Sequence, residues 1–106
     1  LADPSWFAFA VTIKYGAPFK RKHIVQHFEN AKIQTRPYFA GNIMLQPAYS
    51  GIMSSKDVIE KFPIARKITT DTFFIGTSPV ITIEQIKYIE EKLDSFFNEN
   101  FNINRQ

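Results

Sequence analysis

The spacing of the apolar residues changes from a period of two to a helical period near Pro18, and this change constrains the fold more than any other feature of the sequence. Before it, large apolar side chains alternate with small ones, which predicts a strand with one apolar face and one face of small residues. The large side chains are Phe7, Phe9, Val11 and Ile13. After it, a helical stripe is formed by Ile24, Val25, Phe28 and Ala31. A strand followed by a helix that packs on it is therefore the first unit of the fold.

The rest of the chain extends this pattern. Residues 34–39 predict an edge strand or a bulge, because Pro37 cannot donate to a sheet ladder. A long connection follows, then short helices near residues 56–62 and 64–70, and a buried strand at residues 72–76. Thr82-Ile83-Glu84-Gln85 is a capping box that starts the last helix.

A chain of 106 residues has room for one domain. We predict an α+β fold over residues 1–98, with a short sheet of three or four strands and helices on one of its faces. Residues 99–106 are predicted to be a flexible tail.

Composition excludes several classes of protein. The chain has no cysteine, which excludes disulfides, thiolate zinc sites and a cysteine nucleophile within it, and which suits a cytoplasmic protein. No apolar stretch is long enough for a membrane-spanning helix, so we expect no membrane partner. Phosphate-loop, dinucleotide-binding and nucleophile-elbow motifs are missing from the sequence.

The first helix contains two candidates for chemistry. His23 and His27 stand four residues apart, the spacing at which two imidazoles can share a zinc ion, but the sequence shows no third ligand nearby. Solvent-exposed histidines are the simpler interpretation. Lys20, Arg21 and Lys22 place positive charge at the start of the helix. We interpret them as a solvated helix end, with a phosphate contact as the alternative and nucleic acid as a weaker one.

The strand-to-loop transition at residues 34–42 is a candidate ligand site. Arg36 can form paired hydrogen bonds with a carboxylate or phosphate, and Tyr38 or Phe39 can stack on a sugar or pyridine face. Asn42 and Gln46 can donate to hydroxyl or carbonyl groups. The residues alone favour slightly the structural alternative, a core aromatic pair and a turn asparagine.

Six blocks of residues stand in a characteristic order. They are Ala2-Asp3-Pro4-Ser5-Trp6-Phe7, Gly16-Ala17-Pro18-Phe19, Lys32-Ile33-Gln34-Thr35-Arg36, Phe39-Ala40-Gly41-Asn42, Gln46-Pro47-Ala48-Tyr49 and Asp71-Thr72-Phe73-Phe74-Ile75-Gly76. Together they resemble the C-terminal part of CDP-4-keto-6-deoxyglucose 3-dehydrases, in the DegT/DnrJ/StrS family of sugar aminotransferases and dehydrases. The resemblance runs from about Ala2 to Phe97.

The resemblance implies a longer enzyme, of which this chain is the small C-terminal domain of an aspartate-aminotransferase (fold type I) fold. That enzyme would use pyridoxal or pyridoxamine phosphate (PLP or PMP) to remove the C3 hydroxyl of a CDP-linked 4-keto-6-deoxy sugar, toward the dideoxy sugars of lipopolysaccharide. The catalytic residue, most cofactor contacts and the cysteines of a 2Fe-2S cluster would lie in the large domain. A reductase would supply electrons to a cytoplasmic homodimer. The fragment alone is expected to have no activity, cofactor, metal or nucleic-acid partner.

The resemblance also selects among the candidate residues. In the family the segment from Thr35 to Asn42 faces the cleft between domains, so we predict Arg36, Phe39, Asn42 and Gln46 as substrate-binding residues. His23 and His27 are predicted to lie on the surface. Two alternatives stay open. One is a sugar aminotransferase of the same fold, with lysine in place of histidine at the cofactor anchor of the large domain, and the other is a free-standing nucleotide-binding module.

Overall fold

The computed structural model of the chain describes residues 2–101, and its sheet has three antiparallel strands in the order β1-β3-β2. β1 is Ala8–Thr12, β2 is Thr35–Pro37 and β3 is Thr72–Gly76. β3 lies at the centre because the run Phe73-Phe74-Ile75 is apolar toward both faces, whereas Pro37 restricts β2 to an edge. The three strands confirm the predicted α+β class and the short sheet.

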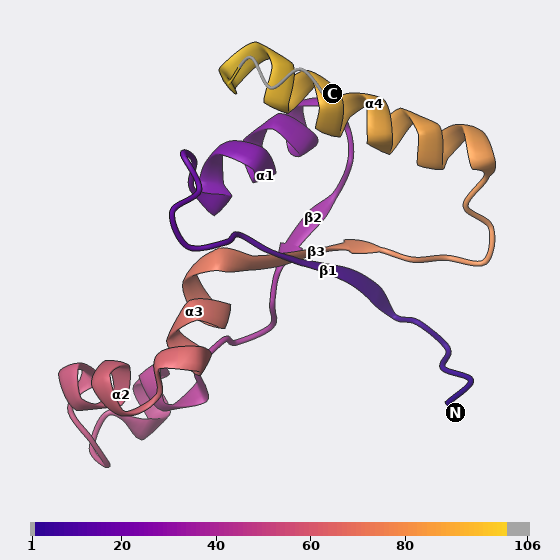
Figure 1. Cartoon of the computed structure of the whole chain (residues 1–106). Helices are drawn as coiled ribbons and strands as arrows, with labels where there is room; N and C mark the ends of the chain where they lie inside the picture. Colours follow the sequence, from indigo (N-terminus) through magenta and orange to yellow (C-terminus); the bar gives the residue numbers. More distant parts are fainter. Residues whose placement is uncertain (1, 102–106) are drawn as a thin grey trace.

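Two helices, α1 (Arg21–Asn30) and α4 (Ile83–Phe101), lie on one side of this sheet (Figure 1). Their inward side chains and one face of the sheet form the main core. Its buried members are Ile13, Ile24, Phe28, Ile33, Phe73 and Phe96. The rings of Phe19 and Phe96 meet edge to face with their centroids 5.1 Å apart. The predicted apolar stripe of α1 is confirmed, since all of its members belong to this core or pack against it.

α4 begins at the predicted capping box. The backbone N–H of Gln85 donates to Thr82 Oγ1 over 3.2 Å, and the N–H of Thr82 donates to Gln85 Oε1 over 2.9 Å. The helix continues beyond the predicted domain boundary at residue 98 as far as Phe101. Packing explains the extension, because the ring of Phe101 lies 5.4 Å from that of Phe19. The rest of the predicted tail, residues 102–106, lies outside the described residues.

The connection between β2 and β3 folds into four short helical pieces that lie together beyond one end of the sheet (Figure 1). They are η1 (Ile43–Leu45), η2 (Pro47–Tyr49), α2 (Ser55–Lys61) and α3 (Pro63–Asp71). Arg21 at the start of α1 joins this region to the main core. Its Nη1 donates to the carbonyl of Thr69 over 2.8 Å and to that of Thr72 over 2.9 Å. One of the three basic residues predicted as a solvated helix end therefore caps the end of α3.

Candidate functional site

The face of the sheet turned away from α1 and α4 has an exposed aromatic cluster centred on Phe74. Phe7, Tyr38 and Phe39 surround Phe74, with ring centroids 5.9, 6.5 and 5.6 Å from its own. These four residues form what we call the aromatic face. Phe74 is 6% exposed, but Phe7 is 71% and Phe39 66% exposed. Large apolar side chains gathered on a surface in this way are typical of a binding site or an interface.

Arg36 lies beside the aromatic face. It is opposite Phe74 in the ladder between β2 and β3, and directly opposed residues of antiparallel strands share a face. The side chain of Arg36 is exposed and forms no hydrogen bond or ion pair with any other residue of the 2–101 region. Its guanidinium is therefore available to an anionic group, and Arg36 and Phe39 border the same surface.

Glu29, at the end of α1, fixes the start of β2 next to Arg36. Its Oε1 accepts hydrogen bonds from the hydroxyl and the backbone N–H of Thr35, both over 2.6 Å. These two bonds hold the pKa of the Glu29 carboxyl below its ordinary value of 4.5, and the nearby charge of Arg36 contributes in the same direction. β2 is thus attached to the core helix as well as to β3.

The loop that follows β2 is fixed to α3. Phe39 and Gly41 both have positive φ, of 48° and 63°, which turn the chain sharply. The backbone N–H of Asn42 donates to Thr69 Oγ1 over 2.7 Å. Gly41 lies so close to Thr69 that a Cβ at this position would be 2.6 Å from the same oxygen. The loop can therefore approach α3 only with glycine at position 41.

Asn42 and Gln46 contribute to the shape of this loop. Asn42 is 5% exposed, and its Oδ1 accepts the backbone N–H of Met44 over 3.1 Å, so that it caps η1. Its Nδ2 has no hydrogen-bond partner within residues 2–101. Gln46 is exposed, and its Nε2 donates to the carbonyl of Ala40 over 3.1 Å. The role of Asn42 and Gln46 as ligand contacts stays a prediction. Gln46 Oε1, on an exposed side chain, is free to make one, whereas Asn42 Nδ2 is buried.

Phe7 and Phe74 belong to this surface but were not predicted as part of the site. The alternation of residues placed Phe7 on the core face with Val11 and Ile13. The strand begins only at Ala8, however, and the ring of Phe7 stacks on Phe39 with centroids 6.2 Å apart. The position of Phe74 depends on the strand order, which a single sequence does not reveal.

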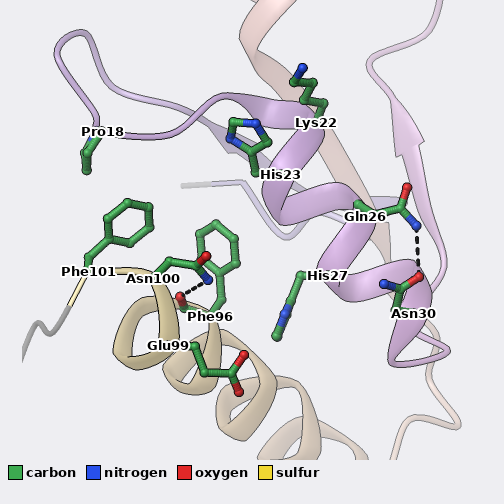
Figure 2. A pocket seen from close by; sticks show the side chains of 10 residues that line it. All are labelled: Pro18, Lys22, His23, Gln26, His27, Asn30, Phe96, Glu99, Asn100 and Phe101. Carbon is green, nitrogen blue, oxygen red and sulfur yellow. Dashed lines mark hydrogen bonds between the residues drawn. The ribbon is translucent and has the colours of Figure 1, made fainter.

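The two histidines of α1 have structural roles. His23 is exposed, and its Nδ1 accepts the backbone N–H of Lys20 over 3.2 Å. Figure 2 shows His27 directed from α1 toward α4, where its Nε2 lies 2.8 Å from the Lys92 carbonyl and its ring packs on Phe96. The predicted surface position is confirmed for His23, which is exposed, and holds only in part for His27, which is half-buried because its ring contacts α4. Across residues 2–101 no group of three or more His, Asp or Glu side chains is placed to hold a metal ion.

Known proteins match this chain almost from end to end. The model of the DegT/DnrJ/EryC1/StrS aminotransferase family matches residues 2–94. The chain belongs to this family. Membership confirms the resemblance drawn from the six sequence blocks. Arg36, the aromatic face and the loop that contacts α3 all lie within the residues that the family model matches.

Individual members of the DegT/DnrJ/EryC1/StrS family are similar to this chain. The lipopolysaccharide biosynthesis protein RfbH of Salmonella typhimurium is 36% identical over 100 residues, which are 94% of this chain and 22% of that protein. A dTDP-4-dehydro-2,6-dideoxy-D-glucose 3-dehydratase of Saccharopolyspora spinosa is 36% identical over 90% of this chain and 20% of its own length. A GDP-4-keto-6-deoxy-D-mannose 3-dehydratase of Yersinia pseudotuberculosis is 29% identical over 80% of this chain.

The chain spans about a fifth of the length of these curated relatives, and the matched region is a C-terminal part of them. Their names support deoxysugar and lipopolysaccharide biosynthesis as the process in which such proteins act. None of the helices formed by residues 2–101 is long and apolar enough to cross a membrane.

Proposed function

We propose that this chain is the C-terminal domain of a PLP- or PMP-dependent nucleotide-sugar 3-dehydratase, and that the complete enzyme removes the C3 hydroxyl of CDP-4-keto-6-deoxyglucose. The observation that carries the proposal is the similarity to relatives named as 3-dehydratases of nucleotide-linked sugars. Those relatives are named for dTDP- and GDP-linked sugars, so the CDP group rests on the resemblance of the six blocks alone. A cytoplasmic homodimer that receives electrons from a separate reductase completes the proposal.

In this proposal the domain supplies one wall of the substrate site. The unpaired guanidinium of Arg36 binds an anionic group of the nucleotide sugar, such as its diphosphate. The exposed ring of Phe39 packs against a base or sugar face. Gln46 donates or accepts hydrogen bonds at the far end of the loop, and Asn42 holds that part of the loop in shape. These contacts bind and orient the substrate, and the domain contributes no acid, base or nucleophile.

In our proposal the residues of this chain do not anchor PLP or PMP. Lys67 is the obvious lysine to test as an anchor, because its side chain is only 19% exposed. Its ammonium is already committed, however. It donates to the carbonyl of Ile13 over 2.7 Å and to Asp71 over 3.0 Å, and it lies 3.8 Å from the ring centroid of Tyr15. In our proposal the cofactor, and any 2Fe-2S cluster, belong to the part of the enzyme outside this chain, and we assign no chemical step to them here.

The test is turnover by the complete native polypeptide loaded with PMP. CDP-4-keto-6-deoxyglucose, together with a reductase and NADH, should give a product that lacks the C3 oxygen, measured by mass spectrometry. The dTDP- and GDP-linked sugars are the comparison substrates. If either is turned over faster than the CDP-linked sugar, its nucleotide replaces CDP in the proposal. A folded, cofactor-loaded polypeptide that turns over none of the three would contradict the proposal.

A sugar aminotransferase is the second candidate, because the matching family is described as one of aminotransferases. Such an enzyme would keep the C3 oxygen and replace the ketone oxygen with nitrogen from an amino-acid donor. The product masses of the same experiment, repeated with glutamate, separate the two reactions. The residue at the cofactor anchor gives an independent answer, since lysine favours the aminotransferase and histidine the dehydratase.

A further inference from the structure

The uncovered surface of the sheet continues from the aromatic face to the free edge of β1. Ala8 and Ala10 lie opposite Gly76 and Phe74, so they share the face of Phe74. Together with Trp6, Phe9 and Thr77 they line an apolar pocket of about 560 Å³. Trp6 is 73% and Phe9 61% exposed. Within residues 2–101 β1 pairs with β3 alone, so its outer edge is free.

We propose that this β1 surface, formed by Trp6, Phe7, Ala8, Phe9 and Ala10, is the contact surface for the polypeptide that precedes this region in the complete enzyme. The inference rests on the proposed function, in which the chain is the C-terminal domain of a longer protein. To the proposed function it adds the surface at which this domain meets the preceding polypeptide and the kind of contact between them.

The chemistry of the β1 surface suits a permanent apolar contact. No charged residue occurs between Asp3 and Lys14, so the surface offers no salt bridge to a transient partner. The small side chains of Ala8 and Ala10 allow a partner backbone to come close to the sheet, while the three aromatic residues supply apolar area at its border. An exposed apolar strand edge of this kind is a site of aggregation unless another segment covers it.

Two observations favour the preceding polypeptide over a second copy of this chain. The relatives carry about four fifths of their length outside the matched region, and that region is a C-terminal part of them. The preceding polypeptide would join through Ala2–Ser5, directly beside the β1 surface, which gives it a high local concentration there.

The overall dimensions agree with a domain that is completed by other polypeptide. The radius of gyration is 16.6 Å, whereas a compact domain of about 100 residues has about 13 Å. Figure 1 shows α1 and α4 on one side of the sheet and the α2–α3 group beyond one of its ends, and the N-terminal end of β1 runs away from both groups. A second packing layer on this side would cover the β1 surface.

Cysteine labelling in the complete native polypeptide tests the inference. Ala10→Cys places a thiol at the centre of the β1 surface, and Val80→Cys places one at a site that is 80% exposed on the loop before α4. N-ethylmaleimide labelling at each position is followed by peptide mass spectrometry, with the urea-unfolded protein as the reference. Ala8→Cys is the second variant in case Ala10→Cys does not fold, as judged by circular dichroism.

We expect Cys at position 10 to react at least about tenfold more slowly than in the unfolded protein, and Cys at position 80 to react at nearly the unfolded rate. Equal rates at both positions in a long, active polypeptide would overturn this inference and leave the proposed function intact. A native polypeptide of 12.3 kDa would overturn both. If position 10 is protected from labelling only at high protein concentration, a second copy of the protein covers the β1 surface, and this inference is overturned.

Discussion

Thr69 Oγ1 accepts the backbone N–H of Asn42 over 2.7 Å and donates to the carbonyl of Ala65 over 2.7 Å. The hydroxyl of Thr69 therefore connects the loop after β2 to the backbone of α3. The same side chain occupies the space that a Cβ of residue 41 would need. The shape of the loop with Phe39 at its start and Gln46 at its end depends on this contact.

Gly41→Ala should destabilise the protein by about 2 kcal/mol, because alanine is strained at φ 63° and its Cβ would overlap the Thr69 side chain. The midpoint of urea unfolding measures the effect. Gly51→Ala is the control, since Gly51 has no neighbouring atom within 4 Å and no positive φ, and it should change the midpoint little. Equal midpoints for the two variants would show that the loop does not need glycine at position 41 to lie close to Thr69.

Arg21→Lys should cost about 1.5–3 kcal/mol although it keeps the charge. The guanidinium of Arg21 reaches two carbonyls from one nitrogen, and a lysine ammonium has a different reach and geometry. Thermal unfolding followed by circular dichroism gives the loss. Lys22→Met, at an exposed neighbour on the same helix, should leave the melting temperature almost unchanged. An unchanged melting temperature for Arg21→Lys would mean that the charge alone, and not the geometry of the guanidinium, stabilises this end of α1.

The stability that Glu29 contributes should depend on pH. Its pKa is lower in the folded than in the unfolded protein, so the contribution is fully present above the unfolded value near 4.5 and is lost as the pH falls through the folded value. Glu29→Gln should therefore lower the unfolding midpoint at pH 7, and the difference from the parent should shrink toward pH 3. Glu90→Gln on α4 is the matched control. A difference that is the same at pH 7 and pH 3 would rule out this linkage.

In the complete enzyme, Arg36→Ala should weaken substrate binding or turnover by about 2 kcal/mol, roughly 30-fold in kcat/KM. The reason for the weaker binding is the loss of the guanidinium that contacts an anionic group of the substrate. Arg36 is exposed and makes no side-chain hydrogen bond within residues 2–101, so its removal leaves no buried group unpaired. The melting temperature should not change. Arg66→Ala removes an exposed arginine of α3 and should be neutral. Unchanged kinetics for Arg36→Ala would make Arg36 a structural or silent residue.

Local patterns predicted most of the elements of this fold. The apolar stripe of α1, Pro37 at an edge and the capping box at Thr82 all appear in the structure where the sequence placed them. The alternation before Pro18 gives β1, although Phe7 lies outside that strand and on the opposite face of the sheet. Each depends on residues that are close in the chain. The end of α4 was less predictable, because Phe101 is held by Phe19, a residue distant in sequence.

The surface around Phe74 was only partly predictable for the same reason. Arg36 and Phe39 could be selected because they stand near each other in the sequence, and the structure does place both beside Phe74. Phe7 reaches them through the pairing of β1 with β3, whose register no local pattern specifies. Likewise, the partner of Arg21 is a helix end 48 residues further along the chain.

The order β1-β3-β2 has a consequence for the biogenesis of the protein. The middle strand is the last of the three to be synthesised, so neither β1 nor β2 has a partner in this sheet until Gly76 has been added. During translation the segments around Phe9 and Tyr38 stay unpaired while α1 can already form. A nascent chain that is interrupted before Thr72 would present β1 and β2 without their partner strand to chaperones and proteases. The sheet is thus closed in one late step, by the strand that contacts both others.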